Sequence, residues 1–108
     1  MLKGIRRLLR QHGYDTVPFE TGSALRDHDE FDQAFCIILD VNLSDGSGIE
    51  LRYQLMELGI ALPVIYVTGN DGHATRMAAL ASGCIAYLTK PFTAQALIEP
   101  IEKAAAIA

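Results

Sequence analysis

Residues 36–43 read CIILDVNL, a stretch that joins a strongly apolar run to a single carboxylate. The consecutive aliphatic residues Ile37, Ile38 and Leu39 are typical of a strand that is buried on both faces of a sheet. Asp40 follows at once, although burying an unpaired carboxylate costs several kcal/mol or shifts its pKa. We therefore expect Asp40 to lie where this strand ends and to have a chemical role there.

Composition restricts the class of protein. The chain has 108 residues and a net charge of −4, which suits one domain and gives no basic face for nucleic acid. No apolar run approaches the roughly 20 residues of a membrane span. The opening MLKGIRRLLR lacks the continuous apolar core of a secretory signal. We therefore expect a cytoplasmic protein that binds neither nucleic acid nor membrane.

Cysteine and histidine usage argues against a structural metal or a disulfide. Cys36 and Cys84 each lie in a hydrophobic run, where a free cysteine behaves as a small apolar side chain, and a disulfide is the weaker interpretation. The three histidines are scattered without a Cys or a carboxylate at ligand spacing. A zinc site is not expected.

Helical and strand-like segments alternate along the chain. Strands that are apolar on both faces and alternate with helices favour a parallel sheet covered by helices on each side. Pro18 places the first strand at a sheet edge, and Pro100 should kink the last helix or delay its start. Thr21 and Thr93 are suited to begin helices, and Gly13 to end one. We expect strands at 15–20, 34–39, 64–68 and 84–89, and helices at about 2–12, 23–29, 49–58, 73–82 and 94–106.

Polar side chains follow three of these strands. Asp40, Thr68 and Lys90 each directly follow or end a hydrophobic strand. In an open parallel α/β sheet, ligands bind at the carboxyl ends of the strands. Adjacent strands lie about 4.8 Å apart, so their terminal side chains meet in one cluster. The sequence therefore predicts a carboxylate, a hydroxyl and an ammonium group that face one another.

This set of groups suits phosphoryl chemistry. A carboxylate can attack phosphorus and form an acyl phosphate. An ammonium and a hydroxyl can hold the phosphoryl oxygens and offset their charge, and Gly69, beside Thr68, would leave room for the group. A divalent cation is normally required as well, and Mg²⁺ prefers carboxylate, carbonyl and water oxygens.

Three motifs resemble one family as a set. The phrase LDVNLSDGSG, then VTG with its threonine 28 positions after Asp40, then LTKPF with its lysine 22 positions later, resembles the receiver domain of two-component response regulators, especially the nitrogen-fixation regulator type. The resemblance covers nearly all of the chain. It implies a flavodoxin-like (CheY-like) α/β fold and a single receiver domain over residues 1–108, with no output domain in this sequence.

The resemblance also implies roles for individual residues. Asp40 is similar to the phosphoacceptor, Thr68 to the hydroxyl that binds the phosphoryl group, and Lys90 to the phosphate-binding lysine, with a cis peptide bond after it. Mg²⁺ would bind the Asp40 carboxylate and the backbone carbonyl of Asn42. Tyr87 matches the switch aromatic that turns inward when Thr68 moves toward the phosphoryl group.

A receiver of this kind is a binding switch rather than an enzyme. The resemblance implies that it takes its phosphoryl group from a sensor histidine kinase or phosphotransfer protein in a phosphorelay. An output partner, still unidentified, would then contact the surface made by residues 73–106, and a homodimer is a further option.

The sequence departs from the family at its start. A complete receiver begins with an apolar strand that ends in an acidic pair, whereas this sequence begins at the first helix. We interpret it as an N-terminally incomplete receiver that lacks the first strand. Truncation, an inward shift of the strand at 15–20, or exchange of elements between two chains would each account for the gap. Weak Mg²⁺ binding and poor phosphoacceptor activity are the expected consequences.

Two other functions compete with this one. A pseudo-receiver, acting as an interaction or dimerisation module without phosphate, fits the missing acids but not the retention of Asp40, Thr68 and Lys90 together. A phosphatase of the haloacid dehalogenase type needs a second Asp two positions after the first, and Asn42 stands there. Taken singly, each motif residue also has an ordinary structural interpretation: Asp40 in a turn, Thr68 in a strand, Lys90 at the surface and Tyr87 in the core.

Overall fold

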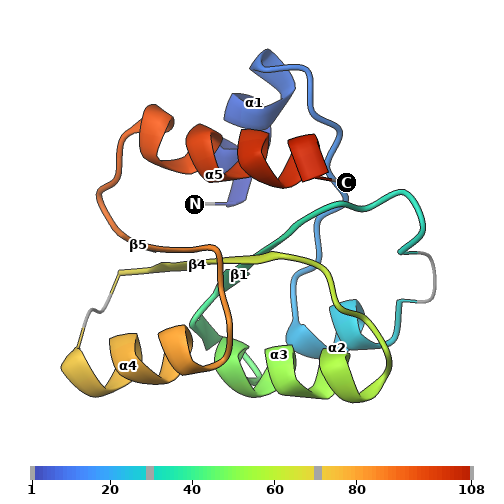
Figure 1. Cartoon of the computed structure of the whole chain (residues 1–108), viewed down its shortest axis with the longest axis vertical. Helices are drawn as coiled ribbons and strands as arrows, with labels where there is room; N and C mark the ends of the chain where they lie inside the picture. The colour runs from blue at the N-terminus through green and yellow to red at the C-terminus, as the bar shows by residue number, and fades with distance from the viewer. Residues whose placement is uncertain (1, 29–30, 70–71, 108) are drawn as a thin grey trace.

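The computed structural model describes residues 2–28, 31–69 and 72–107, and it has three layers. A parallel sheet of order β1-β4-β5 forms the middle layer. Helices α1 and α5 cover one face of this sheet, and α2, α3 and α4 cover the other (Figure 1). The predicted fold, a parallel sheet with helices on both faces, is confirmed. The elements that form these layers are β1 (Ile37–Asp40), β4 (Val64–Thr68), β5 (Ala86–Thr89), α1 (Leu2–Gln11), α2 (Gly22–Arg26), α3 (Gly48–Glu57), α4 (His73–Ala81) and α5 (Ala94–Ile107).

Strand β4 lies at the centre of the sheet, and every one of its residues is buried. It pairs in parallel with β1, where Asp40 lies opposite Val67, and with β5, where Thr68 lies opposite Thr89. The three strands therefore end at one edge of the sheet, as strands of a parallel sheet do.

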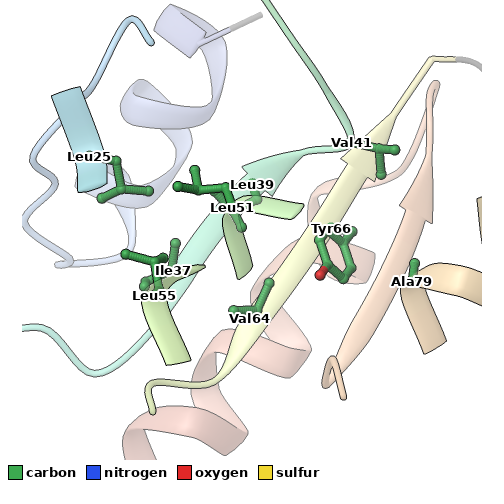
Figure 2. Packing of buried hydrophobic residues seen from close by; sticks show 9 residues of the cluster. All are labelled: Leu25, Ile37, Leu39, Val41, Leu51, Leu55, Val64, Tyr66 and Ala79. Atoms are coloured by element: carbon green, nitrogen blue, oxygen red, sulfur yellow. The ribbon is translucent and has the colours of Figure 1, made fainter. Parts of the chain in front are cut away.

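The side chains of β4 alternate between two apolar cores, because successive residues of a strand point to opposite faces. Val64 and Tyr66 belong to the core under α2, α3 and α4, which Figure 2 shows from close by. Ile65 belongs to the core under α1 and α5, together with Ile5, Leu9, Leu97, Ile98 and Ile101. Each such buried side chain contributes roughly 1.5–3 kcal/mol of burial free energy.

The predicted helix starts are confirmed by hydrogen bonds. The Thr21 hydroxyl accepts from the backbone N–H of Ala24 at 3.1 Å, and the Thr93 hydroxyl accepts from that of Ala96 at 3.1 Å. Gly13, after α1, has φ 85°, a left-handed conformation that favours glycine. The peptide bond between Lys90 and Pro91 is cis, as the resemblance implied.

The strand expected at 15–20 is wrong, because residues 14–19 form neither a helix nor a strand. A strand needs a neighbour for its N–H and C=O groups. Within the described residues, no strand pairs with the edge of β1 that faces away from β4, and Pro18 adds no N–H donor of its own. The proposed inward shift of this segment onto β1 is therefore not what the structure shows.

Other boundaries also differ from the prediction. Strand β1 begins at Ile37 rather than at 34, and β5 begins at Ala86 rather than at 84. Helix α2 ends at Arg26, while the expected end at about 29 lies outside the described residues. A small antiparallel hairpin, β2 (Asn42–Leu43) with β3 (Gly46–Ser47), was not predicted.

Pro100 does not delay the last helix, because α5 begins at Ala94 and continues past the proline to Ile107. The buried face made by Leu97, Ile98, Ile101 and Ala104 keeps the segment helical on both sides of Pro100. Packing thus outweighs the cost of a proline within a helix, about 3 kcal/mol. No helix in the described part of the chain combines the length and apolarity that crossing a membrane requires.

Candidate functional site

Asp40 lies at the end of β1, with both carboxylate oxygens in contact with polar groups. Oδ1 accepts a hydrogen bond from the backbone N–H of Asn42 at 2.9 Å. Oδ2 lies 3.4 Å from the Lys90 ammonium nitrogen, and the Asp40 and Lys90 side chains remain 25% and 32% exposed. The carboxylate is therefore held in place yet open to solvent.

The sheet register brings Thr68 and Lys90 to the same edge as Asp40. The backbone N–H of Lys90 donates to the Thr68 carbonyl at 2.8 Å, and that of Val41 donates to the Val67 carbonyl at 3.0 Å. These bonds continue the β1-β4-β5 ladder beyond the strands themselves. Thr68 is fully buried at the end of β4, whereas Lys90 reaches over to Asp40.

Gly69 follows Thr68 and leaves space at this edge. A Cβ atom at this position would lie 3.8 Å from the Lys90 side chain, an ordinary contact. A side-chain carbon would therefore fit here, so this contact does not by itself require glycine.

Tyr87 lies on β5 opposite Tyr66, at the margin of the core under α4. It is half-buried, and the Arg76 guanidinium lies 5.1 Å from its ring centroid. This distance is within the range of a cation–π interaction. Tyr87 therefore lies between the sheet core and a charged group of α4, two residues before the end of β5.

Few of the described protein oxygen atoms are available to bind Mg²⁺ at the edge of the sheet where Asp40 lies. Among the residues that the structure describes, no three His, Cys, Asp or Glu side chains gather into a metal-binding group. The Asp40 carboxylate and the Asn42 carbonyl are oxygen donors of the kind that Mg²⁺ prefers, and the ion commonly keeps several waters with one or two carboxylates. These residues therefore fit a Mg²⁺ ion that is coordinated mainly by water.

Sequence reasoning missed two residues of the loop after Asp40. The Gly48 backbone N–H donates to the Val41 carbonyl at 2.8 Å, and a side chain at Gly48 would collide with the Asp40 carbonyl. Asp45 accepts hydrogen bonds from the N–H groups of Gly22 at 2.9 Å and of Ser23 at 3.0 Å. The motif SDGSG indicates only a turn, because the partners of Asp45 lie more than 20 positions away in the chain.

These contacts stabilise the charged form of the Asp45 carboxyl. The N–H donors of Gly22 and Ser23, followed by the Ser23 hydroxyl, lower the pKa of the Asp45 carboxyl below its ordinary value of 3.8. Hydrogen bonds to a carboxylate favour its charged form. Asp45 therefore carries its negative charge throughout the neutral pH range.

Comparison with known proteins identifies the family. A family model described as the response regulator receiver domain matches residues 1–102. The chain belongs to this family. Response regulator protein TodT of Pseudomonas putida is 29% identical over 108 residues, which cover 100% of this chain and 48% of TodT. Response regulator protein PmrA of Pseudomonas aeruginosa is 40% identical over 93 residues, which cover 82% of this chain and 40% of PmrA.

Solved structures agree with this membership. The response regulator StyR matches with a TM-score of 0.86 and 32% identity, over 97% of this chain and 53% of the StyR chain. The receiver therefore spans about half the length of TodT and StyR and less than half of PmrA. Receiver domains are regulatory phosphoacceptors of two-component systems; they bind Mg²⁺ for phosphorylation and interact with histidine kinases or phosphotransfer proteins.

Proposed function

We propose that this receiver accepts a phosphoryl group on Asp40 and passes the signal on through protein contacts. The observation that supports this most directly is the Asp40 carboxylate beside the Lys90 ammonium, 3.4 Å apart at the carboxyl edge of a parallel sheet. The donor is a sensor histidine kinase or a phosphotransfer protein, and the proposed place of action is the cytoplasm.

The transfer is a displacement at phosphorus. An Asp40 oxygen forms the new O–P bond while the P–N bond to the donor imidazole breaks, and the imidazole nitrogen keeps the bonding electron pair and takes a proton from solvent. The Lys90 ammonium offsets the charge of the phosphoryl oxygens, and the Thr68 hydroxyl then binds one of them. For this step Thr68 must turn from its buried position.

The proposed Mg²⁺ ligands are the Asp40 carboxylate and the Asn42 backbone carbonyl. Bound Mg²⁺ supplies positive charge that neutralises the phosphoryl oxygens. With one carboxylate in this set, we propose that the affinity for the ion is weak, because site charge and ligand number determine cation affinity. Phosphoryl acceptance by this chain then depends on high Mg²⁺ concentrations.

The proposed output surface lies over residues 73–106, formed by α4, β5 and α5. Met77 and Leu80 on α4 and Ile85 before β5 are large apolar side chains that stay about half exposed. Exposed apolar patches mark protein-binding surfaces, and we propose that these residues belong to one. Upon phosphorylation, Thr68 and Tyr87 would move. This movement would shift the protein toward a conformation whose surface binds an output partner or a second copy of the chain. The protein then acts as a switch, not an enzyme.

Intact mass tests the acceptor role. The protein is incubated with acetyl phosphate at low and high Mg²⁺, beside Asp40→Asn and a Mg²⁺-free control, after circular dichroism has shown that both proteins are folded. We expect one added phosphoryl group at high Mg²⁺ that both controls lack. A folded wild-type protein that gains no mass at any Mg²⁺ concentration contradicts the proposal.

The second candidate is a receiver that binds partners without phosphate. The observation that favours it is the lack of a three-ligand metal group among the described residues. It predicts no mass gain, and it predicts that Asp40→Asn leaves self-association unchanged in sedimentation velocity.

A further inference from the structure

Asp45 connects the loop after Asp40 to a different part of the chain. We propose that Asp45 is a positioning residue for phosphoryl acceptance: by holding the N-terminus of α2, it fixes the loop that supports the Asp40 carboxylate. This inference rests on the proposed function, since it assigns a second residue to the same site. It begins from three contacts of one exposed carboxylate.

The three contacts come from two adjacent residues of α2. Asp45 Oδ1 accepts from the Gly22 N–H at 2.9 Å, and Oδ2 accepts from the Ser23 N–H at 3.0 Å and from the Ser23 hydroxyl at 2.9 Å. A carboxylate bound through both oxygens is fixed in direction as well as in position, because hydrogen bonds to a charged group are short and strong.

Close packing supports the same connection. Gly22 is buried, and a Cβ atom there would lie 3.0 Å from Leu43 Cδ1 and 3.1 Å from Asp45 Oδ1. Both distances are tighter than most real contacts. Glycine at this position therefore lets α2 approach the loop closely enough for Asp45 to bind it.

The loop that contains Asp45 also contacts the Asp40 carboxylate. The Asn42 N–H donates to Asp40 Oδ1 at 2.9 Å, and Asn42 pairs with Ser47 in the β2-β3 hairpin. The Gly48 N–H closes the loop through the Val41 carbonyl at 2.8 Å. Residues 41–48 thus form one closed loop, which directly follows Asp40 and contains Asp45.

The β2-β3 hairpin connects the position of Asp45 to that of Asn42. Leu43 pairs with Gly46, directly beside Asp45. If Asp45 leaves α2, the hairpin loses its hydrogen bonds to that helix, and the Asn42 N–H is held less firmly toward Asp40. A displacement of about 1 Å in such a group is enough to reduce reaction rates about 100-fold.

The first test needs no phosphate. Asp45→Asn replaces one acceptor oxygen with an NH₂ donor, which cannot bind a second backbone N–H. We expect amide hydrogen exchange at Ser23 and Asn42 to become about tenfold faster than in the wild type. Unchanged exchange at both amides overturns the inference.

Asp27→Asn is the matched control. Asp27 lies at the other end of α2, is 76% exposed and forms a 3.7 Å ion pair with Arg26. Its substitution removes the same charge close to the same helix without touching the loop. We expect it to leave exchange at Asn42 unchanged.

The second test measures the initial rate of phosphorylation by acetyl phosphate across a Mg²⁺ series. We expect Asp45→Asn to lower the rate about tenfold and to raise the Mg²⁺ concentration for half-maximal rate. Asp45→Glu, which keeps the carboxylate, should fall between the wild type and Asp45→Asn, and Asp27→Asn should match the wild type. All rates are measured at a temperature well below the thermal unfolding midpoint of each protein, so a change in stability alone does not alter them.

The outcomes separate this inference from the proposed function. A wild-type protein that takes up no phosphoryl group overturns the proposed function and, with it, the role of Asp45 in the reaction. A wild-type protein that is phosphorylated with the same rate and Mg²⁺ dependence as Asp45→Asn overturns the role of Asp45 alone.

Discussion

Lys90 should matter more for phosphoryl acceptance than for stability. Its ion pair with Asp40 is partly exposed, and exposed pairs contribute about 0–1 kcal/mol. We expect Lys90→Ala to change the free energy of unfolding, measured in urea, by less than about 1 kcal/mol. The rate of phosphorylation by acetyl phosphate should fall about 100-fold, as when one charge-stabilising group is removed from other active sites.

Lys103→Ala is the control for this substitution, because Lys103 is an exposed lysine of α5 away from Asp40. It removes the same charge from the molecule and should leave the rate unchanged. If both variants react equally fast, Lys90 does not stabilise the phosphoryl group.

Gly48 and Gly4 give a matched pair for backbone packing beside the acceptor. A Cβ atom at Gly48 would collide with the Asp40 carbonyl, while at Gly4 it would meet nothing within 4 Å. We expect Gly48→Ala to lower the free energy of unfolding by about 1–3 kcal/mol. Gly4→Ala, within α1, should raise it by roughly 0.5–1 kcal/mol. Chemical unfolding measures both, and a neutral Gly48→Ala would show that the loop moves away without cost.

Single residues were predictable where their signal was local. Asp40, Thr68 and Lys90 each end a hydrophobic run, so parallel pairing alone places them at one edge of the sheet, and the ion pair between Asp40 and Lys90 bears this out. Asp45 gave no comparable signal, because its partners on α2 are distant in sequence and are brought near only by the packed Gly22. The functional roles of the predicted site residues remain proposals.

At the scale of elements, Pro100 should be a point of weakness in α5. Proline lacks an N–H donor and its ring crowds the preceding turn, which costs about 3 kcal/mol within a helix. Pro100 lies inside α5 and is only partly buried. We expect Pro100→Ala to raise the free energy of unfolding in urea by about 1–3 kcal/mol.

Glu99→Ala is the neighbouring control, because Glu99 is exposed on the same helix. Its effect should stay within about 0.5 kcal/mol. Equal effects of the two substitutions would mean that the helix has already relaxed around the proline.

Elements were predicted well where packing and local pattern agree. Helices α1, α3, α4 and α5 and strand β4 lie close to their expected positions, since each has an apolar face and a cap or a glycine at one end. The segment at 15–20 has strand-like composition, but pairing depends on a neighbour that its own sequence cannot reveal. The β2-β3 hairpin is too short for an alternating pattern to show.

At the scale of the whole molecule, a parallel sheet covered by helices on both faces could be predicted, because strands that are apolar on both faces and alternate with helices allow few arrangements. The lack of a first strand and of an acidic pair, expected from the sequence, stays a prediction. The two cores lie on opposite sides of β4, so a charge that forms on a side chain packed in either core lowers the stability of the fold.

Alkaline pH should therefore unfold the protein more readily than neutral pH. Burial raises the pKa of the Cys36 thiol from 9.0 to about 11, and burial also raises the pKa of Cys84 and of Tyr66. Well below pH 9 the Cys36 thiol is protonated in both the folded and the unfolded state, so it makes no contribution to the pH dependence of stability. Between pH 9 and about 11 the unfolded chain loses a proton that the folded chain keeps, so the free energy of unfolding falls as pH rises.

Urea unfolding under reducing conditions, from about pH 7 to about pH 10.5, measures this slope. We expect the midpoint to stay level near neutrality and to decline once the pH passes 9, the ordinary pKa of the thiol. Cys36→Ala should flatten the decline, and the slope that remains belongs to Cys84 and Tyr66, which shift in the same direction. An identical decline in the wild type and in Cys36→Ala would mean that the Cys36 thiol ionises as readily in the folded protein as in the unfolded chain.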